Sequence, residues 1–139
     1  MKKIKITCIL LALSMLAGIL IGCAKKKEDK PYMSLSTVLS FADQARDMDL
    51  RFFSQFEYVV LGSSELPLYY FQLKEIDFSF SIGLDADGMI ESMMLSHSSG
   101  QEIYLFHKNP GQLDPNATQY TEDAKSYDLQ KFIDKMTED

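Results

Sequence analysis

The strongest constraint on the fold of this chain is a strict alternation of residue types over residues 76–84. Apolar residues occupy every even position, from Ile76 to Leu84, and Asp, Ser, Ser and Gly occupy the odd positions between them. Side chains of a β-strand point alternately to its two faces, so this pattern indicates a strand with one buried face. The Asp-Ala-Asp-Gly sequence at residues 85–88 predicts a hairpin turn directly after it.

Two more strands are predicted after this turn, over residues 89–97 and 101–107, with Ser-Ser-Gly at residues 98–100 as the second turn. Residues 74–107 therefore form a three-stranded meander. An even-numbered first loop and a three-residue second loop place one apolar set on a common face: Phe78, Phe80, Ile82, Met93, Leu95, Ile103 and Leu105. We expect this face to be the core and the first helix to lie on it.

The opposite face of the predicted meander is only partly polar. It carries several serines, but the same register places four large side chains there: Ile90, Met94, Tyr104 and Phe106. Two interpretations remain open. Either another element, such as the C-terminal helix, covers this patch, or the patch is exposed for binding.

Helices are predicted before and after the meander in the sequence. Over residues 34–47 the apolar residues are spaced three and four apart, and Ser34 or Ser36 can cap the helix start. Near the C-terminus, a helix that begins at Thr121 has an apolar stripe with the same spacing: Leu129, Phe132, Ile133 and Met136. Residues 50–61 fit both a helical and a strand period. Their aromatic and β-branched content favours a strand, and residues 68–73 are also strand-like.

These elements predict an α+β fold, with an N-terminal helix packed on a four- to five-stranded antiparallel meander sheet and a C-terminal helix. The element order over residues 34–107 is similar to that of cystatin-like and β-lactamase-inhibitor-like folds. This is an analogy of order alone, without a shared motif, and it implies nothing about function.

The N-terminus has the parts of an export signal. Three lysines at positions 2, 3 and 5 precede an apolar stretch over residues 6–21, which is shorter than the roughly 20 residues needed to span a bilayer. The following Leu20-Ile21-Gly22-Cys23 is similar to the lipobox of bacterial membrane lipoproteins. This resemblance implies cleavage before Cys23 and attachment of a diacylglyceryl lipid to its thiol.

The resemblance divides the chain into a cleaved signal peptide (1–22), a lipidated Cys23 with a polar tether (23–33), and one α+β domain (34–139). It implies an extracytoplasmic protein that is anchored to the cell membrane by its lipid. Cys8 lies within the apolar stretch, so Cys23 is the single cysteine of the mature chain. No disulfide is then available, and stability must come from packing.

Charge is distributed unevenly along the chain. Residues 25–30 are rich in lysine and can lie against anionic headgroups. From residue 31 onward there are seven Lys and Arg against eighteen Asp and Glu, a formal net charge of −11. An acidic body repels nucleic acid phosphates, so we expect no nucleic-acid binding and a neutral or basic protein partner.

No set of residues predicts a catalytic or metal site. The expected register separates His97 from His107 by roughly 20 Å, too far apart to share a metal. Asp85 and Asp87 resemble the start of a calcium loop, but Met89 and Ser96 occupy the positions where further oxygen ligands are needed. Phosphate-binding and nucleophile-elbow motifs are missing from the sequence. We expect no catalytic residues, no metal, no cofactor and no enzymatic activity.

The sequence therefore favours a membrane-anchored, non-enzymatic binding domain. Its contact residues would come from the apolar patch, if that patch is exposed: Ile90, Met94, Tyr104 and Phe106. A narrower alternative is an inhibitor or immunity lipoprotein that neutralises an exported toxin or hydrolase. The other alternative is an envelope enzyme or ligand carrier, which would need a pocket with convergent polar groups.

Overall fold

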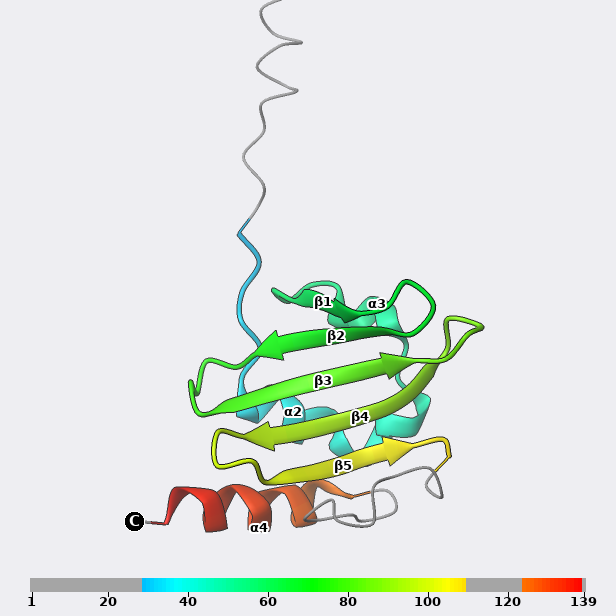
Figure 1. The fold of residues 1–139 in the computed structure, drawn as a ribbon. Helices are drawn as coiled ribbons and strands as arrows, with labels where there is room; N and C mark the ends of the chain where they lie inside the picture. Colours follow the sequence, from blue (N-terminus) through cyan, green and yellow to red (C-terminus); the bar gives the residue numbers. More distant parts are fainter. Residues whose placement is uncertain (1–28, 110–123, 139) are drawn as a thin grey trace, which may run out of the picture.

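A five-stranded antiparallel sheet with helices against one face makes up the described part of the chain, residues 29–109 and 124–138 of a computed structural model (Figure 1). The expected signal segment, Cys23 and Thr121 lie outside these residues. The elements follow one another as α2 (Leu35–Phe41), the 3₁₀ helix η1 (Ala42–Asp47), α3 (Leu50–Phe53), β1 (Val59–Gly62), β2 (Pro67–Gln72), β3 (Phe78–Leu84), β4 (Ile90–His97), β5 (Glu102–His107) and α4 (Ser126–Thr137). The predicted α+β arrangement is confirmed.

The first predicted helix begins where the sequence indicated and ends earlier. Ser34 is the N-cap of α2, because its Oγ accepts a hydrogen bond from the backbone N–H of Thr37 at 3.2 Å. The predicted helix over residues 34–47 is divided after Phe41 into α2 and η1. The predicted apolar stripe is still buried along η1, since Ala42 and Ala45 both lie in the core.

The prediction of a single strand over residues 50–61 is wrong for its first half. Asp49 caps a short helix, α3, by accepting a hydrogen bond from the backbone N–H of Arg51 at 2.8 Å. This helix turns the side chain of Phe53 into the core, where it is 1% exposed. Only Val59–Gly62 forms a strand, β1, at the start of the sheet.

The strands pair in sequence order, so the sheet is a simple meander. Phe80 lies opposite Leu95, and Leu95 lies opposite Ile103, as the alternation predicted. The seven residues expected on the core face are all buried: Phe78, Phe80, Ile82, Met93, Leu95, Ile103 and Leu105. By contrast, Ile76 lies before β3 in the hairpin and is 83% exposed.

Two β-bulges change the face on which strand ends present their side chains. Between β3 and β4 the pairing passes from Ser92 to Ile90, and between β4 and β5 it passes from Tyr104 to Phe106. Each extra residue reverses the alternation beyond it. The prediction that Ile90 and Phe106 share the far face is therefore wrong. Both pack against the core beneath the helices.

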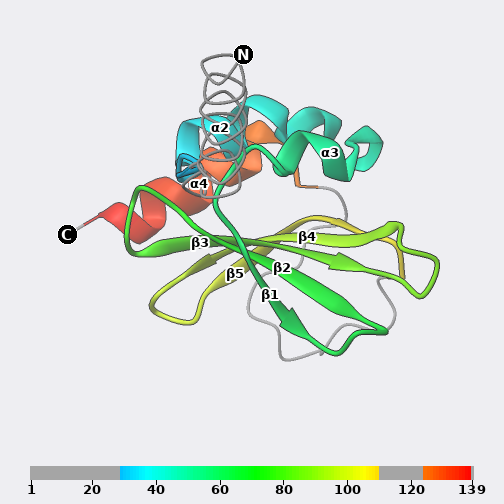
Figure 2. The same cartoon turned by 90° about the horizontal axis from the view of Figure 1, so that it is seen from above.

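The C-terminal helix joins the same layer as the other helices. Leu129, Phe132 and Ile133 of α4 are buried in the common core, and α4 packs against α2 and η1. Figure 2 shows the helices together on one side of the sheet. The alternative in which the C-terminal helix covers the far face is therefore wrong.

Candidate functional site

The two histidines lie at opposite ends of the β4–β5 pair. Next to His97 the strands are joined by the turn at residues 98–100, whereas His107 lies opposite Ser92 at the other end. The His97 ring contacts the Phe78 ring at a centroid distance of 4.8 Å. Within the described ranges, no three His, Cys, Asp or Glu side chains are arranged to hold a metal ion.

Asp85 stabilises the turn of the first hairpin with its side chain. Oδ1 of Asp85 accepts hydrogen bonds from the backbone N–H groups of Asp87 and Met89, at 2.9 and 3.0 Å. Its Oδ2 accepts from Nζ of Lys108 at 2.9 Å. The Lys108 hydrogen bond, followed by that from Met89, lowers the pKa of Asp85. This carboxylate is therefore an ionised structural acceptor.

Of the four residues that the sequence offered as a contact patch, two lie on the far face of the sheet. Met94 and Tyr104 lie opposite each other in a row that crosses all five strands: Val59, Tyr70, Ser81, Met94 and Tyr104. Both are half-buried. Burial raises the pKa of Tyr104, with a further contribution from the charge of Glu102. Phe106 is 7% exposed and lies under the guanidinium of Arg46, 5.0 Å from the ring centroid.

The exposed apolar residues gather instead at the β1 edge. Among described residues, nine large hydrophobic side chains are exposed, and four of them lie in β1 and the loop after it: Val59, Val60, Leu61 and Leu66. We call these four residues with the backbone of β1 the β1 edge. Val59 and Leu61 lie on the far face, because they pair with Tyr70 and Leu68, whereas Val60 lies on the helix side.

β1 pairs with β2 alone, so its other side is the boundary of the sheet. An edge strand directs unpaired backbone N–H and C=O groups outward, and proteins commonly protect such strands with charges or Pro. β1 has neither, since its sequence is Val-Val-Leu-Gly. At the opposite boundary, the backbone N–H of Ala124 donates to the carbonyl of Tyr104 in β5 at 3.3 Å.

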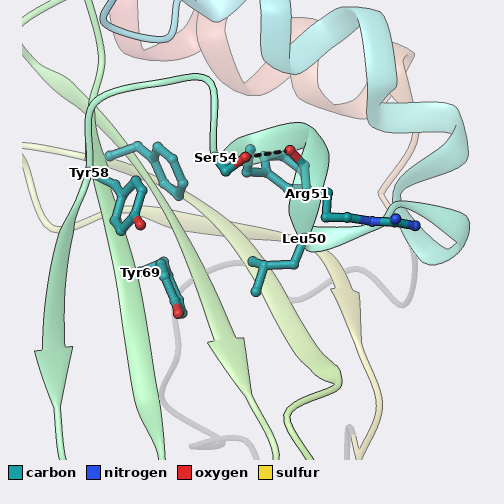
Figure 3. A pocket seen from close by; sticks show the side chains of 7 residues that line it. Leu50, Arg51, Ser54, Tyr58 and Tyr69 are labelled. Carbon is teal, nitrogen blue, oxygen red and sulfur yellow. Dashed lines mark hydrogen bonds between the residues drawn. The ribbon is translucent and has the colours of Figure 1, made fainter. Parts of the chain in front are cut away.

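A hollow of about 170 Å³ lies between α3 and the first two strands, and we call it the ring pocket (Figure 3). It is lined by Leu50, Arg51, Phe53, Ser54, Tyr58, Tyr69 and Phe71. Phe53 and Phe71 are buried, while Tyr58 and Tyr69 form one wall with their rings 5.2 Å apart. Tyr58 immediately precedes β1 and Tyr69 pairs with Val60, so the ring pocket adjoins the β1 edge.

A second hollow adjoins the start of β1, and we call it the tether pocket because Tyr32 forms part of it. It has a volume of about 550 Å³ and is lined by Tyr32, Glu57, Tyr58, Val59, Tyr70, Gln72, Leu73, Lys74 and Ile76. Tyr58 lines both pockets. Nζ of Lys30 lies over the Tyr58 ring, 5.4 Å from its centroid, and donates to the carbonyl of Ser54 at 2.7 Å.

The sequence reasoning missed the β1 edge, although a signal for it is present. Residues 59–61 are three successive apolar residues without alternation, which is typical of a strand buried on both faces. Whether such a strand lies in the centre or at the boundary of a sheet depends on strand order, which the run itself does not encode.

In the described ranges, no helix combines the length and apolar character needed to cross a membrane. The sequence matches no protein-family model, no curated protein and no solved structure.

Proposed function

We propose that the mature chain is a lipid-anchored, non-enzymatic binding protein on the extracytoplasmic face of the cell membrane. In this proposal it takes up an extended segment of a partner protein by strand addition at the β1 edge. The observation that supports it most is a boundary strand that pairs on one side only and has exposed apolar side chains on both faces. In strand addition, main-chain hydrogen bonds supply affinity, and pockets for alternate side chains supply specificity.

The negative charge near β1 favours a basic or neutral partner segment. Glu57 precedes β1, and Glu65 lies in the loop that follows it. The chain from residue 31 onward carries seven basic and eighteen acidic residues. A partner strand with lysine or arginine at its ends would meet complementary charge at both ends of β1, which favours its encounter over that of acidic segments.

The lipid anchor keeps this edge close to the membrane. Asp29 follows Cys23 by six residues, and a fully extended chain of that length spans only about 20 Å. The partner segment in this proposal therefore belongs to a protein that is itself at or near the membrane surface.

Strand addition is tested with a peptide library of extended, lysine-flanked sequences and the purified full-length chain in detergent micelles. We expect bound peptides to slow hydrogen exchange of the β1 amides, Val59–Gly62. Val60→Lys should weaken binding at least tenfold, because it places a charge beside the lysine-flanked strand. Ile76→Lys is the matched control, since Ile76 is also exposed and lies outside β1. Protection at β4 or β5 instead of β1 would contradict the proposal.

The anchor is tested separately by cell fractionation. Cys23→Ser should move the protein from the membrane fraction to the soluble or secreted fraction and remove the mass of the lipid. Cys8→Ser should leave both unchanged, because Cys8 lies in the segment that is cleaved. Membrane association of the Cys23→Ser chain would show that a different segment anchors it.

A further inference from the structure

The ring pocket has the size and the lining of a subsite for one aromatic side chain. We infer that an aromatic residue of the partner segment inserts there when the segment pairs with β1, an inference that rests on the proposed function. The volume of about 170 Å³ is close to that of apolar cavities that accept a single benzene ring. The ligand class is thus an aromatic ring on an extended peptide backbone.

The Arg51 guanidinium and the Ser54 hydroxyl at the rim of the pocket already have partners. Nη2 and Nε of Arg51 donate to the Asp49 carboxylate at 2.9 and 3.2 Å, and Figure 3 shows the guanidinium pointing away from the tyrosines. The Ser54 hydroxyl donates to the carbonyl of Arg51 at 2.7 Å. The surface left for a ligand is therefore formed mainly by Leu50 and aromatic rings, which disfavours a charged side chain.

The lining rings are tilted relative to one another, as aromatic clusters prefer. Tyr58 contacts Phe71 at a centroid distance of 5.7 Å with an interplanar angle of 46°, and Tyr69 at 5.2 Å with 52°. A further ring that enters between Tyr69 and Leu50 can continue this arrangement edge to face. A branched aliphatic side chain would bury less area and lack the ring contacts.

Strand register decides which side chain of the segment enters. Paired residues in neighbouring strands share a face of the sheet, and Val60 pairs with Tyr69 on the helix side. A residue that pairs with Val60 from the outer side would therefore point toward the ring pocket. Its two neighbours along the segment would point to the far face, beside Val59 and Leu61. The aromatic residue thus occupies one fixed position of the segment.

A second copy of the chain is a poorer occupant than a basic partner. Antiparallel pairing of two β1 strands would bring Glu57 and Glu65 of both copies to one seam, between two bodies that are each strongly acidic. Like charges at such a seam are destabilising.

The inference is tested with three synthetic peptides of alternating Thr and Val with Lys ends. They differ only at one central position, which is Phe, Leu or Ala. We expect the full-length chain in detergent micelles to bind the Phe peptide at least about tenfold more tightly than the Ala peptide, because one ring is transferred from water to an apolar site. Leu should be intermediate.

A pocket-filling variant separates this inference from strand addition. Ser54→Trp places a ring in the pocket from an exposed position, and Gln55→Trp is the matched control at the neighbouring exposed residue outside it. We expect Ser54→Trp to remove the preference for Phe and to leave binding of the Ala peptide unchanged. Gln55→Trp should keep the preference. A Phe preference that persists in Ser54→Trp, or equal affinities of the Phe and Ala peptides for the unmodified chain, overturns the inference without affecting strand addition.

A titration with toluene keeps the test informative if none of the peptides binds. If none of the peptides binds, strand addition by these sequences is contradicted. The ring pocket is then tested directly, because NMR reports on toluene binding without any peptide. We expect saturable shifts of the Leu50 methyl and Tyr69 ring signals in the unmodified chain, and no such shifts in Ser54→Trp. Absence of shifts in the unmodified chain overturns the ring pocket as an aromatic subsite.

Discussion

Gly62 ends β1 in a conformation that few other residues adopt. Its φ is +82°, and a Cβ added there would lie 2.8 Å from the carbonyl oxygen of Leu66. The sequence showed a strand end at this glycine, but the close approach of the Leu66 carbonyl is visible only in the folded loop.

We expect Gly62→Ala to destabilise the domain by about 2–3 kcal/mol, since both the left-handed backbone and the contact oppose a methyl group. Gly88→Ala is the control, because Gly88 also has a positive φ, +76°, but a Cβ there meets no atom within 4 Å. Its cost should be about 1 kcal/mol. Urea denaturation of both variants measures the difference, and equal costs would show that the Leu66 contact contributes nothing.

Asp43 links η1 to the start of α4. The backbone N–H and the hydroxyl of Ser126 donate to its carboxylate at 2.8 and 3.0 Å. These bonds, the backbone one foremost, and the charge of Lys125 lower the pKa of Asp43 below its ordinary value of 3.8. The folded state therefore favours the ionised carboxylate more than the unfolded state does.

The stabilisation from Asp43 is thus complete above the ordinary carboxyl pKa, and it is lost as the pH falls below about 4 through the lowered folded-state value. Asp43→Asn keeps an oxygen acceptor for Ser126 but does not titrate. We expect the urea midpoint of the variant to fall less than that of the unmodified chain between pH 5 and pH 3. Parallel pH curves would show that this carboxylate does not contribute to acid sensitivity.

At the scale of elements, the bulges in β4 and β5 decide which side chains belong to the core. Without them, Phe106 would share the far face with Tyr104. The alternating pattern predicted the register of β3, β4 and β5 correctly up to the bulges and incorrectly beyond them. A bulge depends on how a strand fits its neighbouring strands and the layer that covers the sheet. The alternation of residue types within one strand does not encode it.

The difference in burial between Phe106 and Tyr104 can be measured by truncating each side chain to alanine. We expect Phe106→Ala to destabilise the domain by about 3 kcal/mol, because the ring is buried beneath Arg46 and its loss leaves a cavity. Tyr104→Ala, on the half-buried far face, should cost about 1 kcal/mol. Urea unfolding of the two variants provides the comparison. A larger cost for Tyr104 would place the far face, rather than the helix side, in the core.

The division of residues 50–61 into α3 and β1 could not be predicted from the sequence. Residues 50–61 carry helical and strand periods at once, and the chain uses each in turn: Phe53 points inward from a helix, and Val59 follows in a strand. The cap at Asp49 selects the helix locally. Both pockets depend on this change, since Tyr58 lies at the junction and lines each of them. A single strand over residues 50–61, as the sequence predicted, would form neither pocket.

At the scale of the whole molecule, one core joins the helices to the sheet. Phe41 from α2, Phe53 from α3, Phe80 from β3 and Phe132 from α4 all belong to the same buried cluster. The layer order could be predicted, because two amphipathic helices and one apolar sheet face must be buried together. The side on which α4 packs could not, since a far face with Met94 and Tyr104 was apolar enough to accept a helix.

A shared core should unfold as one unit. We expect the near- and far-ultraviolet circular dichroism signals to be lost at the same urea concentration. Reducing agent should not move the midpoint, because both cysteines of the chain, Cys8 and Cys23, precede residue 29. Separate transitions for the two signals would indicate that the helices and the sheet are stabilised independently.

The way the N-terminal segment joins the body determines how the domain would bear a mechanical load. Met33 is fully buried and forms a parallel bridge with Leu73, and its carbonyl accepts from the backbone N–H of Lys74 at 2.8 Å. Two residues earlier, the carbonyl of Pro31 accepts from the backbone N–H of Glu57 at 2.9 Å. A pull along this segment would load these contacts together in shear. Such a force would act both on the segment that leads into β1, through Glu57, and on the β2–β3 hairpin, through Leu73 and Lys74.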